Sequence, residues 1–510
     1  MYTNILVELI ESLSKKELMR FNKFLNSPYY NNRKTLITFF NILRKFHPDF
    51  QNKNFTKENI FKKMYGKENY NDSTFRNLNS DLLKAILLFL KVERMQKDDI
   101  QSSFFLSHEL FEKNSYELFK KEMSKTETLL EMNNTYDGDY FYNRYKINTD
   151  LFYLNLLTKK VIKKDYVINE SKKMIDGIIF ILIFFIIESI KHNDNLLKYT
   201  RTYNIKRYKE FINDFLSIFN FENMIKFVNK NSSLKIHIIE IYYSLIKAFI
   251  NFDDEKYYFE YKKALEEYSG SLGINDNNFL FSRLLDYCVM KINAGQKTSF
   301  DIYMEMFELN KIYIENEYYK TVSSKYIPFD LYRNVLLNCI TVKKLDYMGR
   351  FIKKYSKFLH PSHIFSVESY SMALYHFQKS QFDKALFCLS KIKFDQFVYK
   401  LDMKNLQLKI HFELEEYDAS LYLIDSYKHF LKKSKLLTDS RRTFHNNFLS
   451  YVQKMSLYST GSTSINLEYL YETANSANDI NDKDWILQKI QSMINKKSNK
   501  GQKKMVPLYK

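Results

Sequence analysis

The side chains that could carry out chemistry are few and widely separated in this chain of 510 residues. His360 and His363 come closest to a metal site, but no acidic or thiol partner stands beside them. A bound metal ion needs three or four ligands, so this pair favours a surface turn over a metal site. Carboxylates are plentiful, yet no two of them stand out as an acid–base couple. We therefore expect no catalytic and no metal-binding residues.

Motifs for phosphate or zinc chemistry are missing from the sequence as well. The chain contains no GxxxxGK[ST], no GxGxxG and no HExxH motif, and its 9 glycines are spread over the whole length. A loop that holds phosphate groups relies on glycine for close approach of the backbone. We expect a protein that is not an enzyme and that uses no cofactor.

The cysteines and the first residues of the chain indicate the compartment. Cys288, Cys339 and Cys388 lie far apart in apolar stretches. An odd and scattered set is typical of small buried hydrophobic residues in a reducing compartment, and not of a disulfide framework. Glu8 and Glu11 stand where a signal peptide would carry positive charge, which argues against secretion. We expect a cytoplasmic protein.

The elements that position any site are predicted to be helices. The chain has 9 Gly and 5 Pro, and 17% of its residues are aromatic. Few points can turn sharply, and the apolar residues between them recur with helical spacing. The longest apolar run, residues 177–187, is about half of the roughly twenty residues that cross a hydrocarbon core. This favours a buried central helix over a membrane-associated segment, and we expect no membrane span.

The net charge of +19 belongs mainly to the two ends of the chain. Residues 1–97 hold 18 Lys and Arg against 9 Asp and Glu, and residues 491–510 hold 6 Lys and no acid. The remaining residues carry 54 basic and 50 acidic side chains, so they are almost neutral. Only 13 of the basic residues are Arg, the side chain best suited to bidentate contacts with phosphate or guanine. The basic ends leave nucleic acid open as a partner.

Residues 1–97 are predicted to form a basic helical domain. Ser14 and Glu17 have the spacing of a capping box that opens a helix, and Pro28 follows its end. Further helices are expected at 33–46, 56–65 and 72–95.

A segment of this domain, residues 56–83, resembles the helix-turn-helix of winged-helix response regulators. A short helix ends in Met64, Tyr65 and Gly66, and a loop leads to a second helix that begins at Ser73. The resemblance implies that this second helix recognises DNA. The apolar stretch 85–92 stands where that family has its β-wing. The candidate nucleic-acid contacts are Ser73, Thr74, Arg76, Asn77 and Lys84.

From about residue 101 the sequence changes to paired helices, and a repeat appears. Residues 382–392 and 417–427 match after a shift of 35 residues. Each stretch has an aromatic residue followed by Asp, then a small residue, Leu and a second aliphatic residue. These are positions i, i+3, i+4 and i+7 on one helical face. The same face recurs upstream from Leu345, Phe300 and Phe221, and less completely from Phe252 and Tyr116.

Each of these helices follows another apolar helix and a short polar turn. With Ala373 and Ala385 at small positions and Phe382 between the helices, residues 367–430 resemble the tetratricopeptide repeat (TPR). The resemblance implies a right-handed superhelix whose concave face binds peptides or proteins. No Pro closes either unit, and the spacing upstream is 37 and 45 residues.

The predicted architecture is all-α. A helical N-terminal domain is followed by a TPR-like α-solenoid, with an irregular all-α domain as the alternative to the array. Trp485 is expected in the core of the cap rather than on a ligand platform. The predicted parts are 1–97 for the basic domain, 101–436 for the array, 437–495 for the helical cap and 496–510 for a disordered basic tail.

The sequence favours a non-enzymatic scaffold or adaptor that binds a protein or peptide in the groove of the array. The reason is that a solenoid offers a long concave surface and few pocket-forming loops. The alternative is a DNA-binding regulator that uses the helix-turn-helix-like segment of the basic N-terminal domain.

Overall fold

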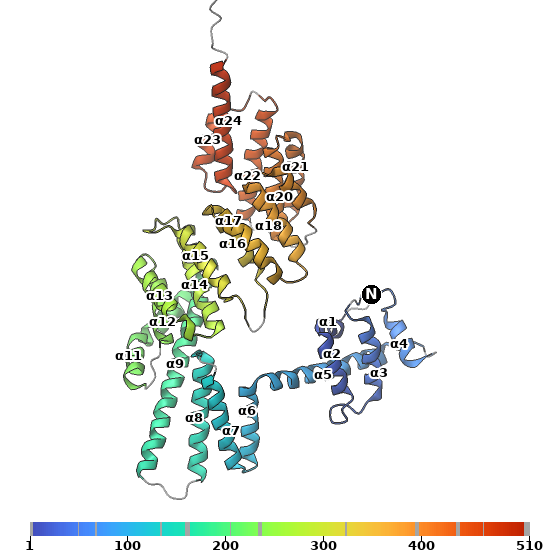
Figure 1. The fold of residues 1–510 in the computed structure, drawn as a ribbon, viewed down its shortest axis with the longest axis vertical. Coiled ribbons are helices and arrows are strands. Elements are labelled where there is room, and N and C mark those ends of the chain that lie inside the picture. Colours follow the sequence, from blue (N-terminus) through green and yellow to red (C-terminus); the bar gives the residue numbers. More distant parts are fainter. Residues whose placement is uncertain are drawn as a thin grey trace, which may run out of the picture. The chain divides into compact units, whose positions relative to one another are not determined.

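The computed structural model consists of helices and their connections (Figure 1). In the residues that it describes, the regular elements run from α1 to α24 with three short 3-10 helices, and no strand is present. The prediction of an all-α protein is confirmed. The described residues are 4–48, 50, 52–66, 69–132, 135–158, 164–203, 206–232, 237–321, 324–392, 397–434, 439–462 and 464–503.

The chain divides into two compact units between Tyr243 and Ser244. This division falls within α12 (Ile238–Ile250), inside the segment predicted as a repeat array. The predicted boundaries near residues 97, 436 and 495 stay predictions.

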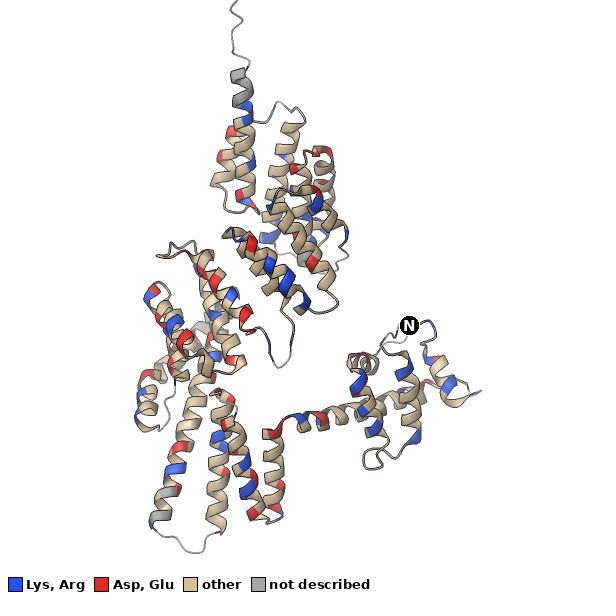
Figure 2. Cartoon of the chain, in the orientation of Figure 1, with Lys and Arg blue, Asp and Glu red and all other residues tan. Residues whose placement is uncertain are grey.

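The N-terminal helices of the first unit enclose one aromatic-rich core. The Phe21 ring lies edge-on to Phe40, with ring centroids 4.8 Å apart, and 5.3 Å from the ring of Phe89. All three rings are buried. Figure 2 shows Lys and Arg residues distributed over these helices, in agreement with the basic composition of the segment. The helices are α1 (Ile5–Ser12), α2 (Lys15–Leu25), α3 (Lys34–Leu43), α4 (Lys57–Tyr65) and α5 (Asp72–Lys97).

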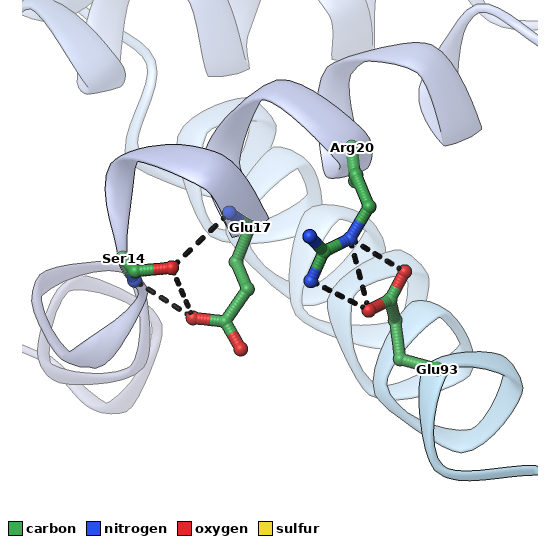
Figure 3. Close-up of polar contacts among 4 residues, drawn as sticks. All are labelled: Ser14, Glu17, Arg20 and Glu93. Carbon is green, nitrogen blue, oxygen red and sulfur yellow. Dashed lines mark hydrogen bonds and ion pairs between the residues drawn. The ribbon is translucent and has the colours of Figure 1, made fainter. Parts of the chain in front are cut away.

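The predicted capping box at the start of α2 is confirmed (Figure 3). The Ser14 hydroxyl accepts a hydrogen bond from the Glu17 backbone N–H at 3.2 Å, and the Ser14 N–H donates to the Glu17 carboxylate at 2.8 Å. One turn later, Arg20 Nε donates to both carboxylate oxygens of Glu93, each at 3.0 Å. This contact ties α2 to α5.

The apolar run 177–187 lies in the middle of the longest helix, α9 (Lys164–Tyr203). Ile179, Ile183 and Ile187 are buried, so the interpretation as a buried helix is confirmed for that face. None of the helices formed by described residues combines the length and apolarity that a membrane crossing requires. The other helices here are α6 (Asp99–Glu112), α7 (Tyr116–Met132), α8 (Gly138–Thr158), α10 (Lys206–Ile218) and α11 (Phe221–Asn231).

In the second unit, helices adjacent in sequence pack against one another along most of the chain, an order consistent with a helical repeat array. The last helix continues to Lys503, past Lys496 where the sequence predicted the disordered tail to begin. Residues 504–510 of that predicted tail lie outside the described residues. The helices are α13 (Glu255–Tyr268), α14 (Ile274–Asn293), α15 (Ile302–Glu315), α16 (Phe329–Thr341), α17 (Leu345–Tyr355), α18 (Ile364–Gln378), α19 (Phe382–Ser390), α20 (Phe397–Glu413), α21 (Tyr417–Lys433), α22 (Asp439–Ser459), α23 (Leu467–Ser476) and α24 (Lys483–Lys503).

The two best-matched stretches of the repeat bury the same positions. Ala385 of α19 and Ser420 of α21 are completely buried, and Leu389 and Ile424 are buried one turn later. Both small residues lie where the helix meets its neighbours, so a larger side chain would push the helices apart.

The register predicted from Phe300 holds only in part, because Phe307 is buried as predicted. Tyr303 should be buried on that register, but it is 42% exposed, whereas Ile302 is buried. The side chain of Asp301 accepts hydrogen bonds from the backbone N–H groups of Tyr303 and Met304, so Asp301 caps the helix. Phe300 therefore precedes the cap, and in the first turn Ile302 is buried in place of Tyr303.

Three helix pairs follow one another here: α16 with α17, α18 with α19, and α20 with α21. The first helix of each pair ends in the same turn. Lys343, Ser380 and Glu415 adopt the left-handed conformation, with φ of 58°, 55° and 61°. In each case the next residue donates its N–H to the carbonyl five positions back, at 2.8 to 2.9 Å. This is the Schellman helix ending. The same ending occurs at Asn114, Gly295, Glu317 and Gly461.

Glycine at these turns is expected to stabilise the second unit. A left-handed conformation costs a residue with a Cβ about 1–2 kcal/mol, and the greater freedom of glycine in the unfolded chain offsets part of the gain. Ser380→Gly and Lys343→Gly should each raise the free energy of unfolding by about 0.5–1 kcal/mol. Lys379→Gly is the control, because Lys379 has φ of −91° and gains nothing. Hydrogen exchange read by mass spectrometry in peptides from α16 to α21 measures the difference, and equal shifts for Ser380→Gly and Lys379→Gly would contradict this account.

Two of the three cysteines are expected to resist alkylation in the folded protein. Burial raises the pKa of both Cys288 and Cys339 to about 12, so their reactive thiolates are scarce near neutral pH. Cys388 is only half-buried, which corrects the expectation of three buried thiols. Iodoacetamide followed by mass spectrometry should find Cys388 modified first. Prompt labelling of Cys288 would contradict the packing.

The same thiols set a pH dependence of stability. An unfolded thiol ionises near pH 8.5, whereas Cys288 and Cys339 stay protonated up to about 12. The folded state therefore binds more protons in that window, and unfolding should become easier as the pH rises through it.

Candidate functional site

A cleft of about 750 Å³ opens on the second unit. Its walls come from the first helices of three successive pairs, α16, α18 and α20, and from the start of α24. No single stretch of sequence builds it, because its residues extend from Leu337 to Lys489.

The three helices contribute residues from equivalent positions. The positions are separated by 37 and then 35 residues, as are the left-handed turn residues that end the same helices. Three successive helix pairs thus build the cleft together. One row consists of Leu337, Leu374 and Lys409, and the next of Thr341, Gln378 and Glu413.

Apolar side chains form a large part of the cleft wall. Phe377 is buried, whereas Ile340 and Phe382 are half-buried. Trp485 lies edge-on to Phe412, with ring centroids 5.5 Å apart, and packs against the apolar core of the C-terminal helices. The prediction that Trp485 belongs to this core is confirmed, and its exposed part also lines the cleft.

Polar contacts hold α24 against α20 at the edge of the cleft. Glu413 accepts a hydrogen bond from the indole Nε1–H of Trp485 at 2.8 Å. It also forms an ion pair with Lys489 at 2.5 Å. Lys409 donates to Asp482 at 2.7 Å, and its ammonium lies 5.5 Å from the centre of the Phe377 ring. The side chains of Glu413 and Lys409 are each 13% exposed, so water screens these contacts only in part.

The charged side chains at the edge of the cleft are engaged with one another. Both acidic side chains in these contacts are paired with lysines, so neither stands ready as a general base. In the described part of the chain, no three or more His, Cys, Asp or Glu side chains are grouped so as to hold a metal ion. His360 and His363 lie in a turn, where His360 Nδ1 is 2.7 Å from the Ser362 hydroxyl.

The predicted nucleic-acid contacts lie on α5, and most of them share its exposed face. Ser73, Arg76, Asn77 and Lys84 are exposed, and Thr74 is half-buried. The helix continues without a break to Lys97, past the point where a β-wing would begin.

Both cations of this face have an acidic neighbour. Arg76 forms an ion pair with Asp72 at 2.9 Å, and Lys84 lies 3.7 Å from Asp81. Acids beside each cation reduce the attraction to phosphate.

The DNA-binding alternative is tested with labelled duplex DNA and the full chain. If it holds, binding should weaken steeply as salt rises, and Arg76→Ala with Lys84→Ala should weaken it further. Binding that ignores salt or both substitutions would end this alternative.

The residues of the cleft were not predicted from the sequence. The spacing of 37 and 35 residues would have identified them, but the prediction applied it only to the second helix of each pair. Applied to the first helices, it places Leu337 and Leu374 on one row. The cap residues of α24 carry no such signal.

Comparison with known proteins gave no match to a family model, to a curated protein or to a solved structure.

Proposed function

We propose that this chain is a non-enzymatic scaffold or adaptor, in which a TPR-like α-solenoid binds a segment of a partner protein in the cleft of α16, α18 and α20. The observation that carries the proposal is the lining of the cleft by equivalent positions of three successive helix pairs. Repeat arrays use surfaces of this kind for extended partners, because each pair adds one more row of contacts.

The dimensions support a polypeptide as the occupant. Packed helices lie about 8–10 Å apart, so three successive first helices extend over about 20 Å. An extended chain advances about 3.4 Å per residue, so a segment of about six residues would span the cleft. Apolar side chains such as Ile340 and Phe377 can receive side chains of the segment. Polar groups such as Gln378 can pair with its backbone.

The test compares the proteins retained by the full chain and by variants in the native cell. Leu337→Glu with Ile340→Glu places charges in the apolar wall at two half-buried positions, where folding should tolerate them. Phe387→Glu is the matched control, because Phe387 is 62% exposed and does not line the cleft. Partners should be retained by the wild type and the control and lost from the cleft variant. Retention of the same proteins by all three would refute the proposal.

A further inference from the structure

One face of the hairpin formed by α8 and α9 is apolar and uncovered. Leu157 on α8 and Ile178 on α9 are 67% and 57% exposed, so neither side chain is part of a core. We call this surface the α8–α9 face. Its exposed members are Tyr142, Tyr153, Leu156 and Leu157 on α8, and Val167, Ile168, Met174, Ile175 and Ile178 on α9.

The face is uncovered because the next helix is much shorter than α9. α9 has 40 residues and α10 has 13. Where α10 packs, Phe185 lies against Phe215 of α10, with ring centroids 6.4 Å apart, and against Phe219 just after that helix, at 5.2 Å. Ile178 precedes Phe185 by two helical turns and lies on the same side of α9. The surface that α10 covers near Phe185 therefore continues, without a cover, toward the start of α9.

A shallow apolar hollow of about 210 Å³ lies between the two helices on this face. Tyr145 and Phe152 line it from α8, and Met174, Ile178 and Ile181 line it from α9. The face is thus a continuous band along the hairpin rather than a set of scattered apolar side chains, which would need no explanation.

Lysines border this band on α9. Lys164 and Lys172 are exposed, and Lys173 lines the hollow. The lysine stems can pack on the apolar band while their ammonium groups reach outward. Lys173 is paired with Glu170, so the positive charge of the border comes from Lys164 and Lys172.

Three described acids of the hairpin, Glu170, Asp176 and Asp150, lie off the band. Glu170 is buried, where it accepts a hydrogen bond from Asn155 at 3.2 Å and pairs with Lys173. Asp176 lies between Met174 and Ile178 in sequence, which places it on the opposite side of the helix. Asp150 follows Lys146 by one turn, and the ammonium of Lys146 lies 3.8 Å from the centre of the Phe104 ring of α6.

We propose that the α8–α9 face binds the surface of an anionic lipid bilayer. Aliphatic side chains with lysines at their border are the pattern of helices that lie in a membrane interface, and tyrosine is enriched at that depth. Each lysine near an anionic surface adds about 1 kcal/mol of attraction. An acidic protein could also pair with the lysines, but protein interfaces favour arginine and are poor in lysine, whereas the exposed cations named on this border are lysines. This activity is independent of the cleft in the second unit.

The experiment is flotation of the full chain with vesicles of phosphatidylcholine, alone or mixed with phosphatidylglycerol. The chain should float with the mixed vesicles, bind pure phosphatidylcholine much less, and dissociate as salt rises. Ile175→Glu with Ile178→Glu should lower partitioning by at least about tenfold, and Lys172→Glu by about tenfold. The three positions are exposed, so folding should be unaffected. Phe387→Glu with Tyr422→Glu, at exposed sites of the second unit, is the matched control and should change nothing.

Two results would overturn the proposal. The first is no flotation with either vesicle, or flotation that the face variants leave unchanged. The second is a dimer of the wild-type chain, seen by sedimentation without lipid, that the face variants convert to a monomer. In that case a second copy of the chain covers the face.

Discussion

Glu413→Ala is expected to lower the stability of the second unit by about 2–3 kcal/mol. The substitution leaves the Lys489 ammonium and the Trp485 indole N–H without their acceptor in a region that is mostly buried. Such groups cannot regain full hydration, so the loss exceeds that of a surface ion pair. Trp485 is the only tryptophan of the chain, so its fluorescence during denaturation reports on the unfolding of the region around α24.

Two controls separate the contributions at this site. Glu413→Gln keeps an oxygen for Trp485 but removes the charge that Lys489 needs, so it should cost less than Glu413→Ala. Asp418→Ala removes an exposed acid shortly after the end of α20 and should leave the stability nearly unchanged. In combination with Lys489→Ala, the effect of Glu413→Ala should be clearly less than additive. Equal effects of Glu413→Ala and Asp418→Ala on stability would contradict a stabilising contact between α20 and α24.

Phe21→Ala is expected to unfold the N-terminal helices locally. Removal of a buried phenylalanine costs about 3–5 kcal/mol, and Phe21 also loses its ring contacts with Phe40 and Phe89. The chain has two compact units, so a single free energy of unfolding is not defined for it. Hydrogen exchange read by mass spectrometry measures each segment separately.

Protection should fall in peptides from α1 to α5, and peptides from residues 244–490 should keep theirs. The matched control is Phe387→Ala, which removes an exposed ring and should change neither segment. A uniform loss of protection along the chain would mean that the N-terminal core does not stand apart, and no loss at all would mean that this core is misassigned.

Local features of the fold could be predicted from the sequence. Helix content follows from the scarcity of Gly and Pro, and the capping box follows from the spacing of Ser14 and Glu17. The small residues Ala385 and Ser420 marked buried positions, because only small side chains fit where helices approach closely.

Features that depend on contacts in the folded chain could not be predicted from the sequence. Ser380 and Glu415 carry no sign of a left-handed conformation, since glycine is the usual signal. The start of α15 is a different case, because Asp301 caps the helix and Asp is a preferred cap residue that the sequence already offered. The cleft depends on contacts such as that between Glu413 and Lys489, which are 76 residues apart.

The central claim is that the cleft of α16, α18 and α20 holds a segment of another protein. The direct test is a photocrosslinking amino acid placed at Thr341 or Gln488, which are both exposed at the cleft. Tyr422, which is 77% exposed outside the cleft, is the matched control position. In the native cell, both cleft positions should crosslink to the same short segment of one protein, and Tyr422 should not. Crosslinks that are absent from the cleft, or as frequent and varied at Tyr422, would contradict the claim.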